Sequence, residues 1–76
     1  MNTEEALLAR YHGSPLLTLV QLAEVLDRSP DGLRISLAGN NELARKLKPA
    51  RVKIGRRVYF RVNAVAEVID SAGANP

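Results

Sequence analysis

Two helix-start signals stand so close together that they fix how the helices they begin can be arranged. A capping box opens at Thr18, and the helical pattern that follows it reaches Asp27 and Arg28. Ser29, followed by a proline, then starts a second helix almost at once. Two short helices joined by so few residues cannot lie antiparallel, so they must cross at a steep angle. The sequence therefore predicts a helix-turn-helix over 18–39.

A further helix is expected at each end of the chain. Thr3 is placed to cap the first one, over 2–12, with two glutamates at its positive end. Asn63 is placed to cap the last one, over 63–72, and Gly73 stands where such a helix would stop. Both ends of the chain are thus expected to be helical.

The segment before the last helix predicts a β-hairpin over 51–61, because two alternating apolar runs flank a glycine. If the apolar residues of both strands share one face, Ile54 must pair with Val58. That register leaves the loop Gly55–Arg57. Residues 42–48 fit a further short helical turn ahead of the hairpin.

These elements follow the order helix, turn, helix, hairpin and helix, which predicts a winged helix-turn-helix, mainly α with a small β-hairpin. The chain of 76 residues suffices for a single domain, 1–76, with one small core. A domain of this size buries only about 60% of its unfolded surface, so a deep catalytic cleft is not expected.

Charge is divided unevenly along the chain. The segment Leu43–Ala66, called the acid-free segment below, has no Asp or Glu but contains eight basic residues: Arg45, Lys46, Lys48, Arg51, Lys53, Arg56, Arg57 and Arg61. The rest of the chain carries all eight acids, so the net charge of +3 averages a basic part with an acidic one. A charge run is often only a solvated face. Bases without any acid favour a surface that neutralises the phosphates of double-stranded DNA.

Four stretches of the sequence also carry a family resemblance: Leu17–Leu26, Ser29-Pro30, Val52–Phe60 and Asn63–Val65. They resemble the excisionase-type, MerR-like winged helix-turn-helix domains of phages, plasmids and integrating elements. The most specific part is Lys-Ile-Gly-Arg-Arg in the hairpin, and residues 1–13 are also similar to the start of pyocin-activator-type regulators. The resemblance implies a recognition helix in the major groove and a basic wing on the DNA backbone or minor groove.

The candidate DNA contacts come from two regions. In the second helix of the helix-turn-helix they are Ser29, Asp31, Arg34, Ile35 and Ser36, and in the acid-free segment Arg45, Lys46, Lys48, Lys53, Arg56, Arg57 and Arg61. Arg34 stands within reach of a guanine edge or a phosphate. Arg56 and Arg57 are expected at the hairpin tip, on phosphates or in the minor groove. Ile35 points away from the core, as a thymine-methyl contact, a protein contact or an exposed isoleucine without a role.

Other functions lack the residues they need. The chain has no cysteine, and its single histidine, His12, stands without a carboxylate cluster, so neither a metal site nor a catalytic centre is expected. Nothing points to a cofactor, a small-molecule ligand or a membrane span. The acidic start is unlike a signal peptide. The expectation is a non-enzymatic, cytoplasmic protein associated with the nucleoid.

Three functions remain open from the sequence. The first is a sequence-specific DNA-binding regulator of transcription, encoded by a mobile element or plasmid. The second is an excisionase-like recombination directionality factor. The third belongs to another class, a protein-interaction module whose basic face binds an acidic partner.

Self-association is expected because one short recognition helix reads too few base pairs to be specific alone. A homodimer or a head-to-tail oligomer on DNA would supply the missing contacts. Leu7, Leu8 and Tyr11 form an apolar stripe in the first helix that could join two copies. The alternative is that this stripe covers the core of its own chain.

Overall fold

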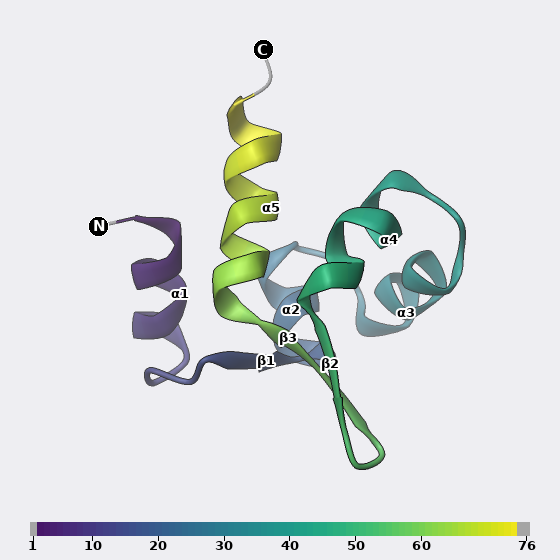
Figure 1. Cartoon of the computed structure of the whole chain (residues 1–76), viewed down its shortest axis with the longest axis horizontal. Coiled ribbons are helices and arrows are strands. Elements are labelled where there is room, and N and C mark those ends of the chain that lie inside the picture. The colour runs from purple at the N-terminus through teal and green to yellow at the C-terminus, as the bar shows by residue number, and fades with distance from the viewer. Residues whose placement is uncertain (1, 75–76) are drawn as a thin grey trace.

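A computed structural model of the chain describes residues 2–74 and shows a mainly helical protein with a small three-stranded antiparallel sheet (Figure 1). The elements in chain order are α1 (Thr3–Arg10), β1 (Leu16–Thr18), α2 (Leu19–Val25), α3 (Pro30–Ala38), α4 (Glu42–Leu47), the 3-10 turn η1 (Lys48–Ala50), β2 (Arg51–Ile54), β3 (Arg57–Arg61) and α5 (Val62–Ala74). The predicted fold class, helices with a small β element, is confirmed at this level. Every helix within the described residues is too short or too polar to traverse a lipid bilayer.

The sheet contains a strand that the sequence analysis did not predict. β1 pairs with β3, and the strand order is β1-β3-β2. Leu17 of β1 lies opposite Phe60 of β3, and both side chains are buried. Leu17 directly precedes Thr18, the residue that caps α2. It is also the residue through which β1 extends the hairpin into a sheet.

The hairpin forms, but the predicted register is wrong. Ile54 pairs with Arg57 and not with Val58, so the loop contains only Gly55 and Arg56. The prediction assumed that both strands bury their apolar residues on one face. β2 is an edge strand, and its Ile54 is 53% exposed, so this burial does not constrain the register. Gly55 has φ +62°, which suits the first central residue of a two-residue hairpin turn.

The two helices predicted at 18–39 are present and joined by a tight turn. Thr18 accepts a hydrogen bond from the backbone N–H of Gln21, and the Gln21 side chain accepts one from the N–H of Thr18. The capping box is therefore confirmed. Asp27 stops α2 with φ +56°, a left-handed conformation that aspartate tolerates. Ser29 then caps α3 by accepting from the N–H of Gly32.

Loss of the Thr18 cap should weaken the fold by a modest, measurable amount. Thr18→Ala leaves the N–H of Gln21 without its partner at the start of α2, which should lower the free energy of unfolding by about 1 kcal/mol. Urea denaturation followed by circular dichroism measures this change. Thr18→Ser keeps the hydroxyl and should retain most of the stability. Equal midpoints for the alanine and wild-type chains would show that the cap contributes nothing.

Both terminal helices differ in detail from the prediction. Asn2, and not Thr3, caps α1, and the Thr3 hydroxyl instead donates to the carboxylate of Asp70 on α5. α5 begins before Asn63, whose side chain accepts from the N–H of Ala64. It also continues through Gly73, so that glycine does not end the helix. The contact between Thr3 and Asp70 joins α1 to α5, and apolar residues of both helices pack in the same core.

The apolar stripe of α1 packs against the chain's own core. Leu7 is buried, and Leu8 and Tyr11 are partly buried against the core residues. The Tyr11 hydroxyl donates to the carbonyl of Gln21 at 3.3 Å, and burial raises the pKa of this phenol above its ordinary value. This placement follows the alternative in which the stripe covers the core of the same chain. Self-association through α1 stays a prediction.

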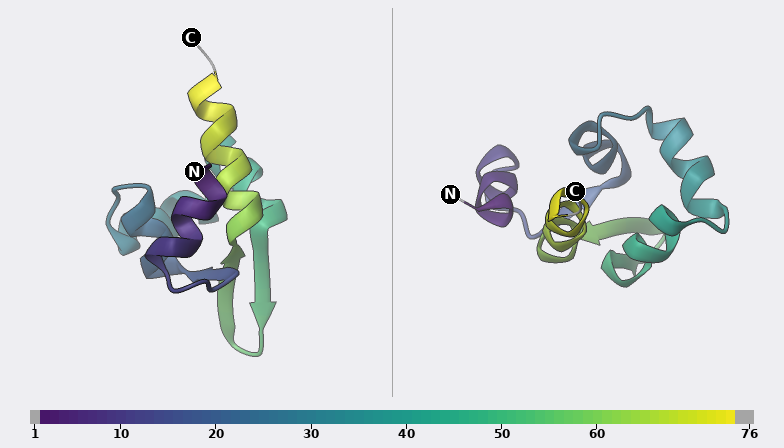
Figure 2. Two further views of the ribbon diagram at one scale, coloured as in Figure 1. Left: turned by 90° about the vertical axis from the view of Figure 1, so that its left-hand side faces the viewer. Right: turned by 90° about the horizontal axis from the view of Figure 1, so that it is seen from above.

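One hydrophobic core holds the helices on one face of the sheet. The core side chains come from every helix and from β1, η1 and β3: Leu7, Leu17, Leu22, Ala23, Leu33, Leu47, Ala50, Phe60, Val62, Val65 and Ala66. The β2–β3 hairpin extends beyond the helices, and α3 and α4 lie at the end of the molecule opposite α1 (Figure 2). The hairpin and these two helices are therefore positioned to form one surface.

Candidate nucleic-acid interface

A groove of about 670 Å³ runs between α3, α4 and the hairpin. Its apolar floor includes Leu37 of α3 and Phe60 of β3. Four cationic side chains from four elements line it: Arg34 of α3, Arg45 of α4, Lys48 of η1 and Arg51 of β2. No Asp or Glu is among the described residues that line it. We call this feature the basic groove.

The segment between α3 and the hairpin places two of these cations. Asn41 caps α4 by accepting from the N–H of Ala44 at 2.8 Å, and its amide nitrogen donates to the carbonyl of Ser36 at 2.7 Å. The same side chain therefore begins α4 and fixes it to α3. Arg45 and Lys48 line the groove together with Ala38 and Gly39 at the end of α3. The sequence indicated a short helix here but did not indicate where it lies.

The sheet register places the cations of β2 and β3 on two different faces of the sheet. Arg51 pairs with Phe60 and Lys53 with Val58, so both cations share the sheet face that the helices cover. Both remain exposed because β2 is an edge strand.

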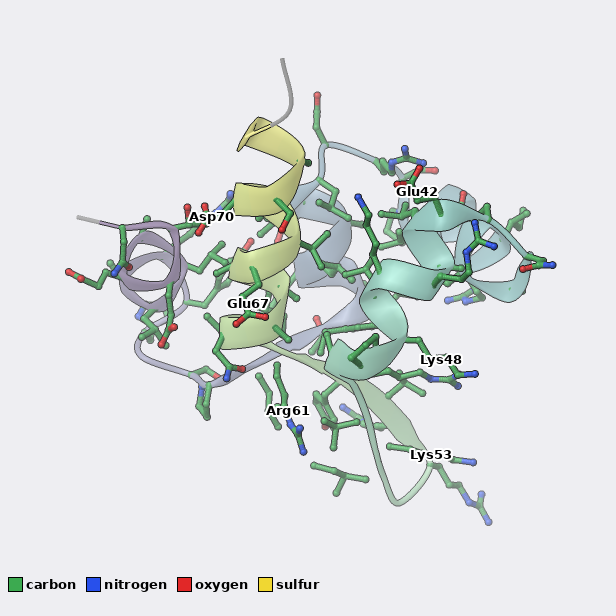
Figure 3. All side chains as sticks on the ribbon, turned by 45° about the horizontal axis from the view of Figure 1, so that its top comes forward. Glu42, Lys48, Lys53, Arg61, Glu67 and Asp70 are labelled. Atoms are coloured by element: carbon green, nitrogen blue, oxygen red, sulfur yellow. The ribbon has the colours of Figure 1, made fainter. Side chains whose placement is uncertain are left out.

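The other two cations of the sheet lie away from the groove. Arg57 and Arg61 alternate with Val58 and Phe60 along β3 and therefore lie on the opposite face. Arg61 stands apart from Lys48 and Lys53 (Figure 3) and lines a separate hollow beside α1. Arg61 therefore does not line the basic groove, and its contact with DNA stays a prediction.

The outward surface of α3 contains only part of the predicted set. Asp31, Arg34 and Ile35 are exposed on one side of the helix, and Ile35 is 74% exposed. Leu33 is wholly buried on the other side. Ser36 is half-buried and does not lie on the outward surface, because it stands beside Leu33 and Leu37, which pack against the core. Its carbonyl instead anchors the next helix.

Two acids lie on α3 and α4, and each is paired with a neighbouring cation. Asp31 accepts from Arg34 at 3.2 Å, and Glu42 pairs with Lys46 at 3.1 Å. Lys46 is thus a partner of Glu42 and does not line the groove. Such pairing neutralises acids that would otherwise weaken the positive field of the surface.

The two acids of α5 lie away from Lys48 of η1 and Lys53 of β2. Glu67 and Asp70 on α5 lie beside α1, whereas Lys48 and Lys53 project from the other side (Figure 3). The acids of α5 are therefore separated from the basic groove, whereas Asp31 and Glu42 lie on α3 and α4 and are each paired with a cation.

Of the predicted contacts, Arg34, Arg45 and Lys48 line the basic groove. Lys53 lies on the same face of the sheet as the groove residue Arg51. Arg56 and Arg57 are exposed at the hairpin tip, as expected for residues outside the core. Arg51 was not singled out as a contact, although it lies in the acid-free segment and lines the groove. Its place could have been inferred only from the correct hairpin register.

Comparison of the chain with protein-family models, with curated proteins and with solved structures gave no match.

Proposed function

We propose that this chain is a sequence-specific double-stranded DNA-binding protein of the winged helix-turn-helix type that acts as a small transcriptional regulator. In this proposal α3 is the recognition helix and the β2–β3 hairpin is the wing. The resemblance to excisionase-type and MerR-like domains supports the same assignment. The role at a promoter is the part of the proposal that rests on this resemblance alone.

The observation that carries the proposal is the basic groove. Its four cations come from four separate elements, which the fold brings together at one surface beside the outward side of α3. Duplex DNA presents phosphates along a continuous backbone, and each one that a cation neutralises releases a condensed counterion. A backbone strand lying in the groove would meet Arg45, Lys48 and Arg51 while α3 enters the adjacent major groove.

The hairpin tip extends this contact surface. Arg56 and Arg57 lie at the tip, where the hairpin projects beyond the helices (Figure 2). A basic wing reaches the backbone or the minor groove next to the recognition helix. Both side chains are exposed and neither contributes to the core, so their positive charges serve the surface and not the fold.

Salt dependence tests the proposal directly. Fluorescence anisotropy of a labelled duplex, titrated with the chain at several salt concentrations, should show log affinity falling linearly with log salt. Each phosphate contact adds about −0.9 to the slope, so three groove cations and two tip arginines should give about −4.5. A slope near zero would contradict DNA binding.

A competitor separates DNA from an acidic protein partner. Poly-glutamate of matched charge presents carboxylates without the geometry of a duplex. It should compete with DNA only weakly, because a flexible chain cannot place its charges along the groove and the wing together. Binding of poly-glutamate as tight as that of the duplex would favour the protein-interaction function instead.

A further inference from the structure

We propose that Asp31 is a positioning residue that holds Arg34 for base recognition and keeps it off the phosphates. The pair, and not Arg34 alone, would then discriminate the preferred duplex from random DNA. This inference rests on the proposed function, since it assigns the source of specificity within the same interface.

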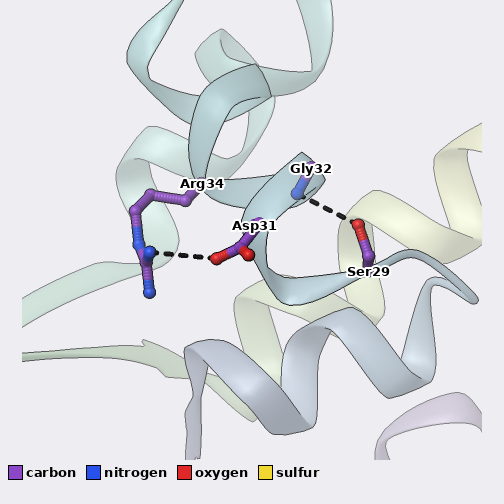
Figure 4. A network of polar contacts seen from close by, with 4 residues as sticks. All are labelled: Ser29, Asp31, Gly32 and Arg34. Atoms are coloured by element: carbon purple, nitrogen blue, oxygen red, sulfur yellow. Dashed lines mark hydrogen bonds and ion pairs between the residues drawn. The ribbon is translucent and has the colours of Figure 1, made fainter.

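The two side chains are joined on the outward side of α3. Nη1 of Arg34 donates to Oδ1 of Asp31 at 3.2 Å (Figure 4). The side chain of Arg34 is 68% exposed and that of Asp31 is 89% exposed, so both are accessible to a bound duplex. The contact is local, between residues three apart on one helix, and forms without help from any other element.

The backbone beneath Asp31 is held in place. Ser29 caps the helix by accepting from the N–H of Gly32 at 3.1 Å (Figure 4). A Cβ at position 32 would lie 2.8 Å from the Ser29 hydroxyl oxygen, so a glycine leaves room for this cap. Asp31 stands in the first turn, where the positive end of the helix favours a carboxylate. The backbone that carries the Asp31 carboxylate is therefore held by the Ser29 cap.

In the proposed function, a carboxylate at position 31 is electrostatically unfavourable. Asp31 lies on the side of α3 that faces the duplex in the proposed function, where a carboxylate is repelled by phosphates. The helix dipole favours this exposed carboxylate only modestly, and an exposed ion pair adds little more to stability. The side chain that the Asp31 carboxylate contacts directly is that of Arg34.

Arg34 has two possible uses, and Asp31 separates them. Its side chain lines the basic groove together with Arg45 and Arg51, where it could add one more phosphate contact to any sequence. Paired with Asp31, the guanidinium is held beside the outward side of the helix and keeps its other N–H groups for a guanine edge. The carboxylate thus lowers affinity for random DNA and orients the group that reads the preferred site.

Asp31→Asn tests this division of roles. The preferred duplex is first selected with the wild-type chain from a random pool, and affinities for it and for a random duplex are then measured. Removal of the charge should raise affinity for random DNA about threefold and steepen its salt slope by about 0.9. The ratio of specific to random affinity should fall about tenfold. Asp31→Glu retains a carboxylate and should keep most of the ratio.

Glu42→Gln is the matched control, because it removes the carboxylate of the other ion pair, 3.1 Å from Lys46 on α4. It should raise affinity for both duplexes alike and leave their ratio unchanged. An unchanged ratio in Asp31→Asn, or an equal fall in Glu42→Gln, would overturn the inference while leaving DNA binding intact. Absence of DNA binding by the wild-type chain would overturn the proposed function and the inference with it.

Discussion

Replacing Phe60 with alanine should lower the free energy of unfolding by about 3–5 kcal/mol. Phe60 is 2% exposed and is the largest wholly buried side chain among the described residues. It lies opposite Leu17 on the central strand and also forms part of the floor of the basic groove. The cavity left by its ring would open where the sheet meets the helices.

The expected loss is large relative to the whole stability of so small a domain. A chain of 76 residues has a total stability of about 4–11 kcal/mol. Thermal and urea denaturation should therefore show a much lower midpoint, or no cooperative transition at all. Tyr59→Ala is the matched control, because this neighbouring aromatic residue lies half-buried on the other face of the same strand. Equal losses in the two variants would contradict the burial pattern described above.

Removing two cations of the basic groove should weaken DNA binding about 100-fold without unfolding the chain. Arg45→Ala combined with Arg51→Ala removes one guanidinium from α4 and one from β2, on two sides of the groove. Both residues are exposed, so the circular dichroism spectrum and the melting temperature should change little. The slope of log affinity against log salt should lose about 1.8 of its magnitude.

The matched control removes the same charge elsewhere. Arg10 stacks over the ring of Tyr11 at 5.2 Å on α1, and Arg61 lies beside α1 on the far face of the sheet. Arg10→Ala combined with Arg61→Ala should change affinity far less than the groove variant, since neither residue lines the groove. Similar losses in both double variants would mean that net charge, and not the groove, governs binding.

Local signals in the sequence were reliable where the structure depends on neighbouring residues. The hydrogen bonds of Thr18 with Gln21 and of Ser29 with Gly32 span three residues, so the starts of α2 and α3 could be predicted from spacing. The left-handed turn at Asp27 is local in the same way. The predicted ends of α1 and α5 were less accurate. Asn2 and Thr3 both suit a cap, but Asn2 accepts from the N–H of Glu5 while the Thr3 hydroxyl donates to Asp70.

The candidate interface was predictable in its chemistry but not in its geometry. Three of the four groove cations lie in the acid-free segment, and three of the four were among the predicted contacts. Arg51 lines the groove but was not among the predicted contacts, whereas the predicted contacts Lys46 and Arg61 do not line it. Charge depends on composition, whereas the direction of a side chain in the sheet depends on strand register. A register shifted by one residue turns every side chain to the other face.

The sequence alone determined the identity of the helix pair, the presence of a hairpin and the separation of acids from bases. Each of these depends on residues a few positions apart, whose interactions do not change when distant parts of the chain move. Tertiary structure decided that β1 joins the sheet and that Ile54 turns out of the core. It also decided that Asn41 fixes α4 against α3. These outcomes depend on which face of the sheet the helices cover. The packing of the whole core, with Leu17 and Phe60 opposite each other, determines that face.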